Sequence, residues 1–121
     1  MKKISRLATY VTTLKKDLEN FIRGKKVAVW GASLQSLTVL AVTGIRGIRC
    51  VVDSSPEKQN RFTPVSHIPI VSPKALREDS VEAVIIMAPR YEKEILRQLK
   101  TQEKFSGTIA ILNGSKLKIL K

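Results

Sequence analysis

The feature that most constrains the fold is an ordered run of elements early in the chain. Residues 25–30 have the pattern of a short buried strand, and Gly31 follows in a turn. Residues 34–43 are typical of a helix, and residues 48–52 of a second buried strand that ends at Asp53. A strand, a glycine turn, a helix and another strand make a βαβ unit, in which the two strands lie parallel in one sheet.

An amphipathic helix is predicted ahead of this unit, over residues 4–22. Its apolar stripe has three- and four-residue spacing and comprises Ile4, Leu7, Ala8, Val11, Leu14, Leu18, Phe21 and Ile22. Gly24 follows as a natural C-terminal cap. We expect residues 1–24 to form a helix that packs on a domain of residues 25–121.

The segment from residue 54 to residue 73 is predicted to be extended or turning. It holds four prolines, which restrict the backbone, and 68–71 is its only plausible strand. A short helix is expected to follow, with Ser72 as its cap and Pro73 as its first residue.

The remaining pattern repeats the alternation of strand and helix. Residues 81–88 and 108–112 predict strands, and residues 91–100 predict the helix between them. Asn113-Gly114 is typical of a type I′ hairpin, so residues 116–120 are expected to return antiparallel at an edge. The predicted fold class is α/β, a three-layer Rossmann-like sandwich with a mostly parallel sheet.

Charge narrows the possible partners. With 22 Lys and Arg against 10 Asp and Glu, the 121-residue chain carries a net charge of +12 and should attract polyanions. The basic residues are spread along the sequence and aromatics make up only 5%, which is unlike a single-stranded nucleic-acid reader. We expect a solvated basic surface and no specific nucleic-acid binding, with polyanion binding as an alternative function.

The length of the apolar runs and the number of cysteines predict where the protein resides and what its thiol can do. No apolar run approaches the ~20 residues of a membrane span, and polar residues interrupt any signal-peptide core, so cytoplasmic residence is expected. Cys50 is the single cysteine, so it can make no internal disulfide, and we expect a buried thiol.

The turn after the first predicted strand is a candidate phosphate site. Gly31, Ala32 and Ser33 precede a helix N-terminus, where free N–H groups favour anions. The dinucleotide fingerprint would need further glycines at Ser33 and Ser36, which argues against tight NAD binding. A tight turn without a ligand is the competing interpretation.

Other candidate residues follow the strands that come later. Asp53 stands where an acid can bind ribose hydroxyls, or where it can cap the turn of Ser54-Ser55-Pro56. Arg90 and Tyr91 follow the strand of residues 81–88 at its ligand-binding end, although a solvated helix start explains them equally. His67 is expected to be a packed or hydrogen-bonded loop histidine, with a substrate contact as the alternative. No catalytic constellation and no metal site can be assembled from these residues.

The segment after Asp53 resembles a family signature. Asp53-Ser54-Ser55-Pro56-Glu57-Lys58-Gln59-Asn60, then Pro64-Val65 and Ile68-Pro69-Ile70, are similar to the Asp-x-x-Pro-x-Lys-x-Gly, Pro-Gly and Ile-Pro-Ile of the C-terminal domain of S-adenosylmethionine-dependent sugar C-methyltransferases. The resemblance implies a Rossmann-like domain that packs against a methyl-transferring domain and helps to enclose a nucleotide-linked deoxysugar. The candidate binding residues are then Gly31, Ala32, Ser33, Asp53, Ser54, Lys58, His67, Arg90 and Tyr91.

The chain also departs from the family pattern. Family glycines are replaced by Ser36, Asn60 and Val65, and a Trp-Asn pair by Pro89-Arg90. Asn60 can adopt a left-handed backbone, whereas Val65 should resist one. The zinc-binding cysteines and the cofactor-binding domain of the complete enzymes are absent from the sequence.

We therefore expect a non-catalytic module that binds a nucleotide-sugar or docks to a methyltransferase partner. A standalone NAD(P)- or nucleotide-binding Rossmann domain is an alternative. An exposed docking face also predicts a homodimer, formed through the helix of residues 4–22 or the face that the family turns to its methyltransferase domain.

Overall fold

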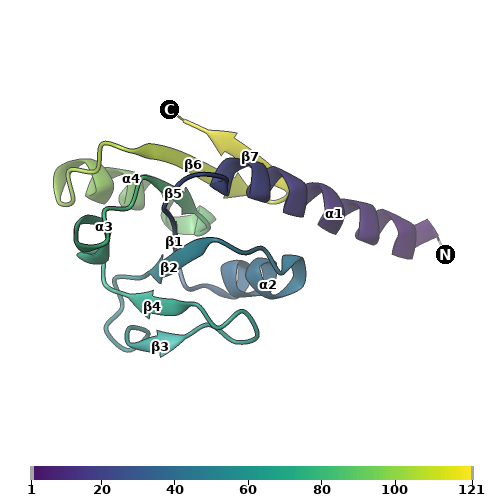
Figure 1. Cartoon of the computed structure of the whole chain (residues 1–121), viewed down its shortest axis with the longest axis horizontal. Helices are drawn as coiled ribbons and strands as arrows, with labels where there is room; N and C mark the ends of the chain where they lie inside the picture. Colours follow the sequence, from purple (N-terminus) through teal and green to yellow (C-terminus); the bar gives the residue numbers. More distant parts are fainter. Residues whose placement is uncertain (1, 121) are drawn as a thin grey trace.

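The computed structural model describes the backbone of residues 2–120 and the side chains of residues 9–120. Seven strands form one sheet in the order β3-β4-β2-β1-β5-β6-β7 (Figure 1). The elements are α1 (Lys2–Ile22), β1 (Val27–Trp30), α2 (Leu34–Thr43), β2 (Ile48–Val52), β3 (Arg61–Phe62), β4 (Pro69–Val71), α3 (Ala75–Glu78), β5 (Ala83–Ile86), η1 (Pro89–Tyr91), α4 (Glu92–Thr101), β6 (Thr108–Asn113) and β7 (Lys116–Ile119). The inner strands β4, β2, β1, β5 and β6 are parallel to one another, and the edge strands β3 and β7 are antiparallel to their neighbours. The predicted fold class is confirmed.

Alternation along the strands creates the three layers. Val27 and Val29 of β1 belong to one buried cluster with residues of α1 and α2, whereas Ala28 and Trp30 belong to a second cluster with residues of α3 and α4. Successive strand residues point to opposite faces, so a strand that is apolar throughout needs helices on both sides. Figure 1 shows α1 and α2 on one side of the sheet and α3 and α4 on the other.

Helix α1 joins the sheet through its C-terminal half. Leu14, Leu18, Phe21 and Ile22 are buried in the first cluster. The side chains of three further stripe positions lie outside the described residues; they are Ile4, Leu7 and Ala8. Gly24, with φ of 74°, follows the helix end as predicted. No helix in the described part of the chain is long and apolar enough to cross a membrane.

Two local predictions are wrong between β2 and β5. The segment 54–73 contains a second strand, β3, which pairs with β4 although both of its residues are exposed. A two-residue edge strand buries no face, so it leaves no hydrophobic pattern to read. Helix α3 begins at Ala75 and not at Pro73, and its N-cap Lys74 makes no side-chain cap bond. The carbonyl of Ser72 instead accepts a hydrogen bond from the amide of Ala75, at 3.1 Å.

The last hairpin is present, but its turn is of another type. Asn113 pairs with Lys116, so the two turn residues are Gly114 and Ser115. Among the described residues of this turn, only Gly114 has a positive φ, at 63°. A positive φ at the first central residue alone is the pattern of a type II′ turn, whereas type I′ needs it at both. The predicted type I′ turn is therefore wrong.

The loop between β3 and β4 contains left-handed residues. In this loop Val65 has φ of 64°, against the prediction that it resists this conformation, whereas Asn60, which lies just before β3, has φ of 65° as expected. Thr63, which is buried, closes the loop because its hydroxyl oxygen accepts a hydrogen bond from the amide of Ile68, at 2.8 Å. The closed loop holds Val65 in the strained region while its side chain faces solvent.

Candidate functional site

Gly31 allows the turn after β1 to lie against Met87 and Ala88, the two residues that follow β5. Its φ is 117°, and a Cβ there would lie 3.0 Å from Cβ of Ala88 and 3.2 Å from the carbonyl oxygen of Met87. An L side chain at this position would be strained by the backbone conformation and crowded by Met87 and Ala88. The glycine is thus required by packing, whether or not a ligand binds.

The amides of this turn are mostly used within the protein. The amide of Gly31 donates to the carbonyl of Val52 at 2.8 Å. Ser33 and Ser36 form a capping box, in which each amide donates to the other residue's hydroxyl. The hydroxyl of buried Ser36 also donates to the carbonyl of Gly31. The positions where a dinucleotide fingerprint needs glycines are therefore filled by serines that stabilise the turn.

Two amides at the start of α2 are left for a ligand. Within the described part of the chain, the N–H groups of Leu34 and Gln35 have no hydrogen-bond acceptor, as is normal for the first turn of a helix. These donors and the helix dipole favour an anion at this end of α2.

Asp53 connects the first turn to the loop after β2. One carboxylate oxygen accepts the amide of Ala32 at 2.9 Å, and the other accepts the amide of Ser55 at 2.8 Å. The second bond is the predicted cap of the Ser54-Ser55-Pro56 turn. Each carboxylate oxygen can accept a further bond, so Asp53 keeps acceptor capacity for ligand hydroxyls.

Lys58 brings a positive charge to the same place. Its ammonium nitrogen donates to the carbonyl of Ala32 at 3.2 Å, which holds the side chain across the first turn. The residue is otherwise exposed. An ammonium has three donors, so Lys58 can bind an anion while it keeps this bond.

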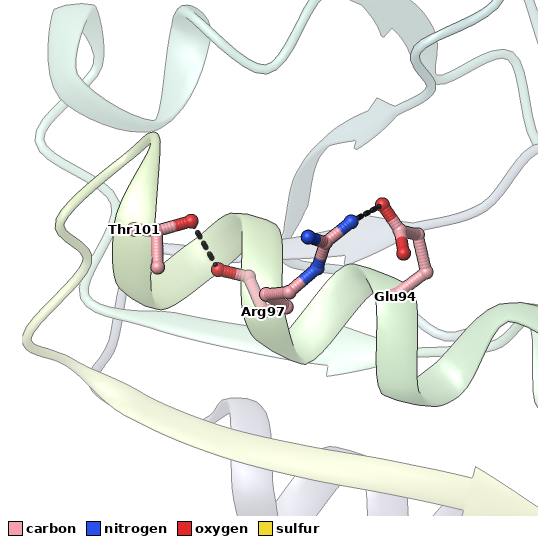
Figure 2. Close-up of polar contacts among 3 residues, drawn as sticks. All are labelled: Glu94, Arg97 and Thr101. Atoms are coloured by element: carbon pink, nitrogen blue, oxygen red, sulfur yellow. Dashed lines mark hydrogen bonds and ion pairs between the residues drawn. The ribbon is translucent and has the colours of Figure 1, made fainter.

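Helix α4 supplies the opposite wall. Tyr91, Glu94, Ile95 and Gln98 have three- and four-residue spacing and therefore lie on one face of the helix. Figure 2 shows the guanidinium of Arg97 donating to the carboxylate of Glu94, at 2.6 Å, so the negative charge of this wall is partly compensated.

These walls enclose an open cavity of about 480 Å³. Its lining comprises Trp30, Gly31, Ala32, Ser33, Asp53, Ser54, Ser55, Lys58, Ala88, Tyr91, Glu94, Ile95 and Gln98. A cavity of this size at the carboxyl ends of parallel strands can hold a small ligand.

Most of the predicted site residues meet in this cavity, but two do not line it. Arg90 lies in a neighbouring hollow with Ser33 and Leu34. His67 is in the β3–β4 loop, where its ring stacks on that of Phe62 with centroids 4.8 Å apart. The packed interpretation of His67 agrees with this position.

The α4 wall beyond Tyr91 was not predicted from the sequence. The signal was present, because Glu94, Ile95 and Gln98 continue the helical spacing from Tyr91 toward the sheet. Polar residues on a helix are usually read as a solvated face, so only the position of α4 across the cavity identifies them.

The single cysteine, Cys50, does not line the cavity. Burial raises the pKa of the Cys50 thiol to about 11, with a smaller contribution from Asp79, so the thiol stays protonated at neutral pH. Among the described residues, no group of three or more His, Cys, Asp or Glu side chains is placed to hold a metal ion.

Comparisons with known proteins place the chain in a family. A family model described as the C-methyltransferase C-terminal domain matches residues 1–112. No curated protein matches the chain. The solved structures include a similar one, UDP-D-quinovosamine 4-dehydrogenase from Vibrio fischeri, with a TM-score of 0.58 and 18% identity over 80% of this chain and 93% of that chain. That likeness shows the Rossmann-type fold, and the family match shows that the chain belongs to the C-methyltransferase C-terminal domain family.

Proposed function

We propose that the chain is a non-catalytic module that binds a nucleotide-sugar in the cavity between the β1–α2 turn and α4. The observation that carries the proposal is the convergence of unlike groups on one cavity. Lys58 favours phosphate, whereas Asp53 can accept hydrogen bonds from sugar hydroxyls. The free amides of Leu34 and Gln35 line the neighbouring hollow, which shares Ser33 and Tyr91 with the cavity and favours an anion beside it. Tyr91, which is exposed in the same wall, offers an aromatic face to a base or a sugar.

The same geometry favours a nucleotide-sugar over a dinucleotide. Ser33 and Ser36 place side chains where a dinucleotide fold has glycines, and the amide of Ala32 is held by the carboxylate of Asp53. Fewer backbone donors are therefore free for a pyrophosphate than in a Rossmann site with all of its glycines.

The proposal includes a partner protein, because the described residues offer no assembled catalytic group. In this proposal, a methyltransferase chain supplies the chemistry and this module helps to hold the substrate. The family description and the open cavity support this arrangement.

Calorimetry with UDP- and dTDP-sugars tests the binding. Replacing Lys58→Ala should weaken binding about tenfold, because one charge-assisted hydrogen bond is lost. Lys100→Ala is the matched control, since it removes the same charge from an exposed position outside the cavity lining. No heat at millimolar ligand, or equal effects of the two variants, would contradict the proposal.

A further inference from the structure

The outer face of α2 is unusual for a surface helix. The helix sequence, residues 34–43, contains no charged residue. Leu34 is 83% exposed and Val42 is 57% exposed, and the exposed Thr38 lies between them at four-residue spacing. A helix next to solvent normally carries polar or charged residues on that side. Among the side chains that the structure describes, none covers this line of Leu34, Thr38 and Val42.

The exposed line continues into a groove against α1. Tyr10 and Val11 of α1 face Leu34, Val39 and Val42 of α2 across a groove of about 470 Å³. Tyr10, Val11, Leu34, Val39 and Val42 together form what we call the α2 face. In Figure 1, α1 passes beside α2 on the same side of the sheet. A groove between two helices is suited to a third helix that lays its apolar side chains into it.

Charges around the groove indicate what kind of chain fits it. The described residues that line the groove include no charged side chain. Arg90 shares a hollow with Leu34 at one end, and Lys116 and Lys118 lie on β7, which contacts α1. The chain as a whole carries +12. A second copy would bring these like charges together, which opposes self-association, whereas acidic residues would be attracted.

We propose that the α2 face binds an amphipathic helix of another polypeptide, with leucine-like residues on its apolar side and acidic residues on its flanks. The apolar groove supplies the contact area, and the charges of Arg90, Lys116 and Lys118 favour an acidic partner. This proposal does not rest on ligand binding in the cavity, because the described linings of the groove and the cavity have no residue in common.

Two synthetic peptides test the proposal with the full chain. Both carry the same leucines at helical spacing; one has Glu on its polar face and the other has Lys. Fluorescence anisotropy of the labelled Glu peptide should show saturable binding, and the Lys peptide should bind at least about tenfold more weakly. The double variant Leu34→Ser, Val42→Ser should weaken Glu-peptide binding by about tenfold or more, because two apolar contacts are lost.

The controls keep the result interpretable. Both substituted side chains are exposed, so the double variant should fold, and its thermal unfolding is compared with the wild type. Phe62→Ser removes an apolar side chain as exposed as that of Val42 from the edge strand β3, outside the groove, and should leave peptide binding unchanged. Equal binding of the two peptides, or binding that ignores the double variant, would overturn the proposal. A wild-type dimer in sedimentation that the double variant dissociates would also overturn it, since a second copy would then be the occupant.

Discussion

The turn after β1 and the loop between β3 and β4 both use a left-handed backbone, but with different residues. The turn has Gly31, with φ of 117°, and it is packed against Met87 and Ala88 at the end of β5. The loop has Val65, with φ of 64°, and this side chain is 85% exposed. Where a Cβ would be crowded, only glycine is accommodated. Where the side chain faces solvent, the cost is limited to backbone strain of about 1–2 kcal/mol and is tolerated.

The largest effect is expected at the packed turn. Gly31→Ala should lower the free energy of unfolding by about 3 kcal/mol, because backbone strain and crowding against β5 add together. Gly24→Ala is the control, since Gly24 also has a positive φ but nothing lies within 4 Å of its added Cβ. That variant should lose only about 1 kcal/mol. Equal losses in urea denaturation would show that crowding plays no part.

The second effect concerns the hydrogen bonds that hold this turn. Asp53→Ala removes the acceptor of the Ala32 and Ser55 amides and should lower stability by about 2 kcal/mol. Glu57→Ala is the comparison, because exposed Glu57 accepts only the hydroxyl of Ser55 and should change stability by less than about 0.5 kcal/mol. If the two variants unfold alike, Asp53 does not stabilise the turn.

The strained loop should respond in the opposite direction. Val65→Gly relieves the left-handed β-branched residue but makes the unfolded chain more flexible, so a net gain of about 1 kcal/mol is expected. Asn60→Gly should be nearly neutral, because asparagine tolerates this conformation. A loss of stability on Val65→Gly in thermal unfolding would mean that the exposed side chain makes a contact that offsets the strain.

The smallest effect is expected on α4, which carries no such strain. Arg97→Ala removes the exposed pair with Glu94 and should change stability by less than about 0.5 kcal/mol (Figure 2). Thr101, whose hydroxyl donates to the carbonyl of Arg97 at 2.7 Å, keeps its bond in the variant because the backbone is unchanged. A loss above about 1 kcal/mol in calorimetric melting would show that the pair orders the cavity wall.

The same contrast explains what the sequence could predict. Buried strands such as β1 and β5 are apolar throughout and alternate with helices along the chain, so the sequence predicted that they exist and that they pair in parallel. Strand β3 and the left-handed backbone of Val65 were not predicted. The first depends on pairing with β4, and the second on the hydrogen bond from Ile68 to Thr63 that closes the loop. Tertiary contacts decide such segments, and no local pattern records them.

The candidate site divides in a similar way. Gly31 and Asp53 follow β1 and β2 directly, so the rule for carboxyl ends of parallel strands identified them. Glu94 and Gln98 face the cavity only because α4 lies across it, and this position depends on the packing of Ile95 and Leu99 into the core.

Titration of the single tryptophan tests the central claim most directly. Trp30 is buried, lines the cavity and adjoins the Gly31 turn, so a ligand there should change its fluorescence. We predict a saturable change with a UDP- or dTDP-sugar, a midpoint at about tenfold higher concentration in Lys58→Ala, and no change with NAD(H), NADP(H) or S-adenosylmethionine. An unchanged spectrum with millimolar nucleotide-sugars, or a response to NAD(P)(H) instead, would contradict the account.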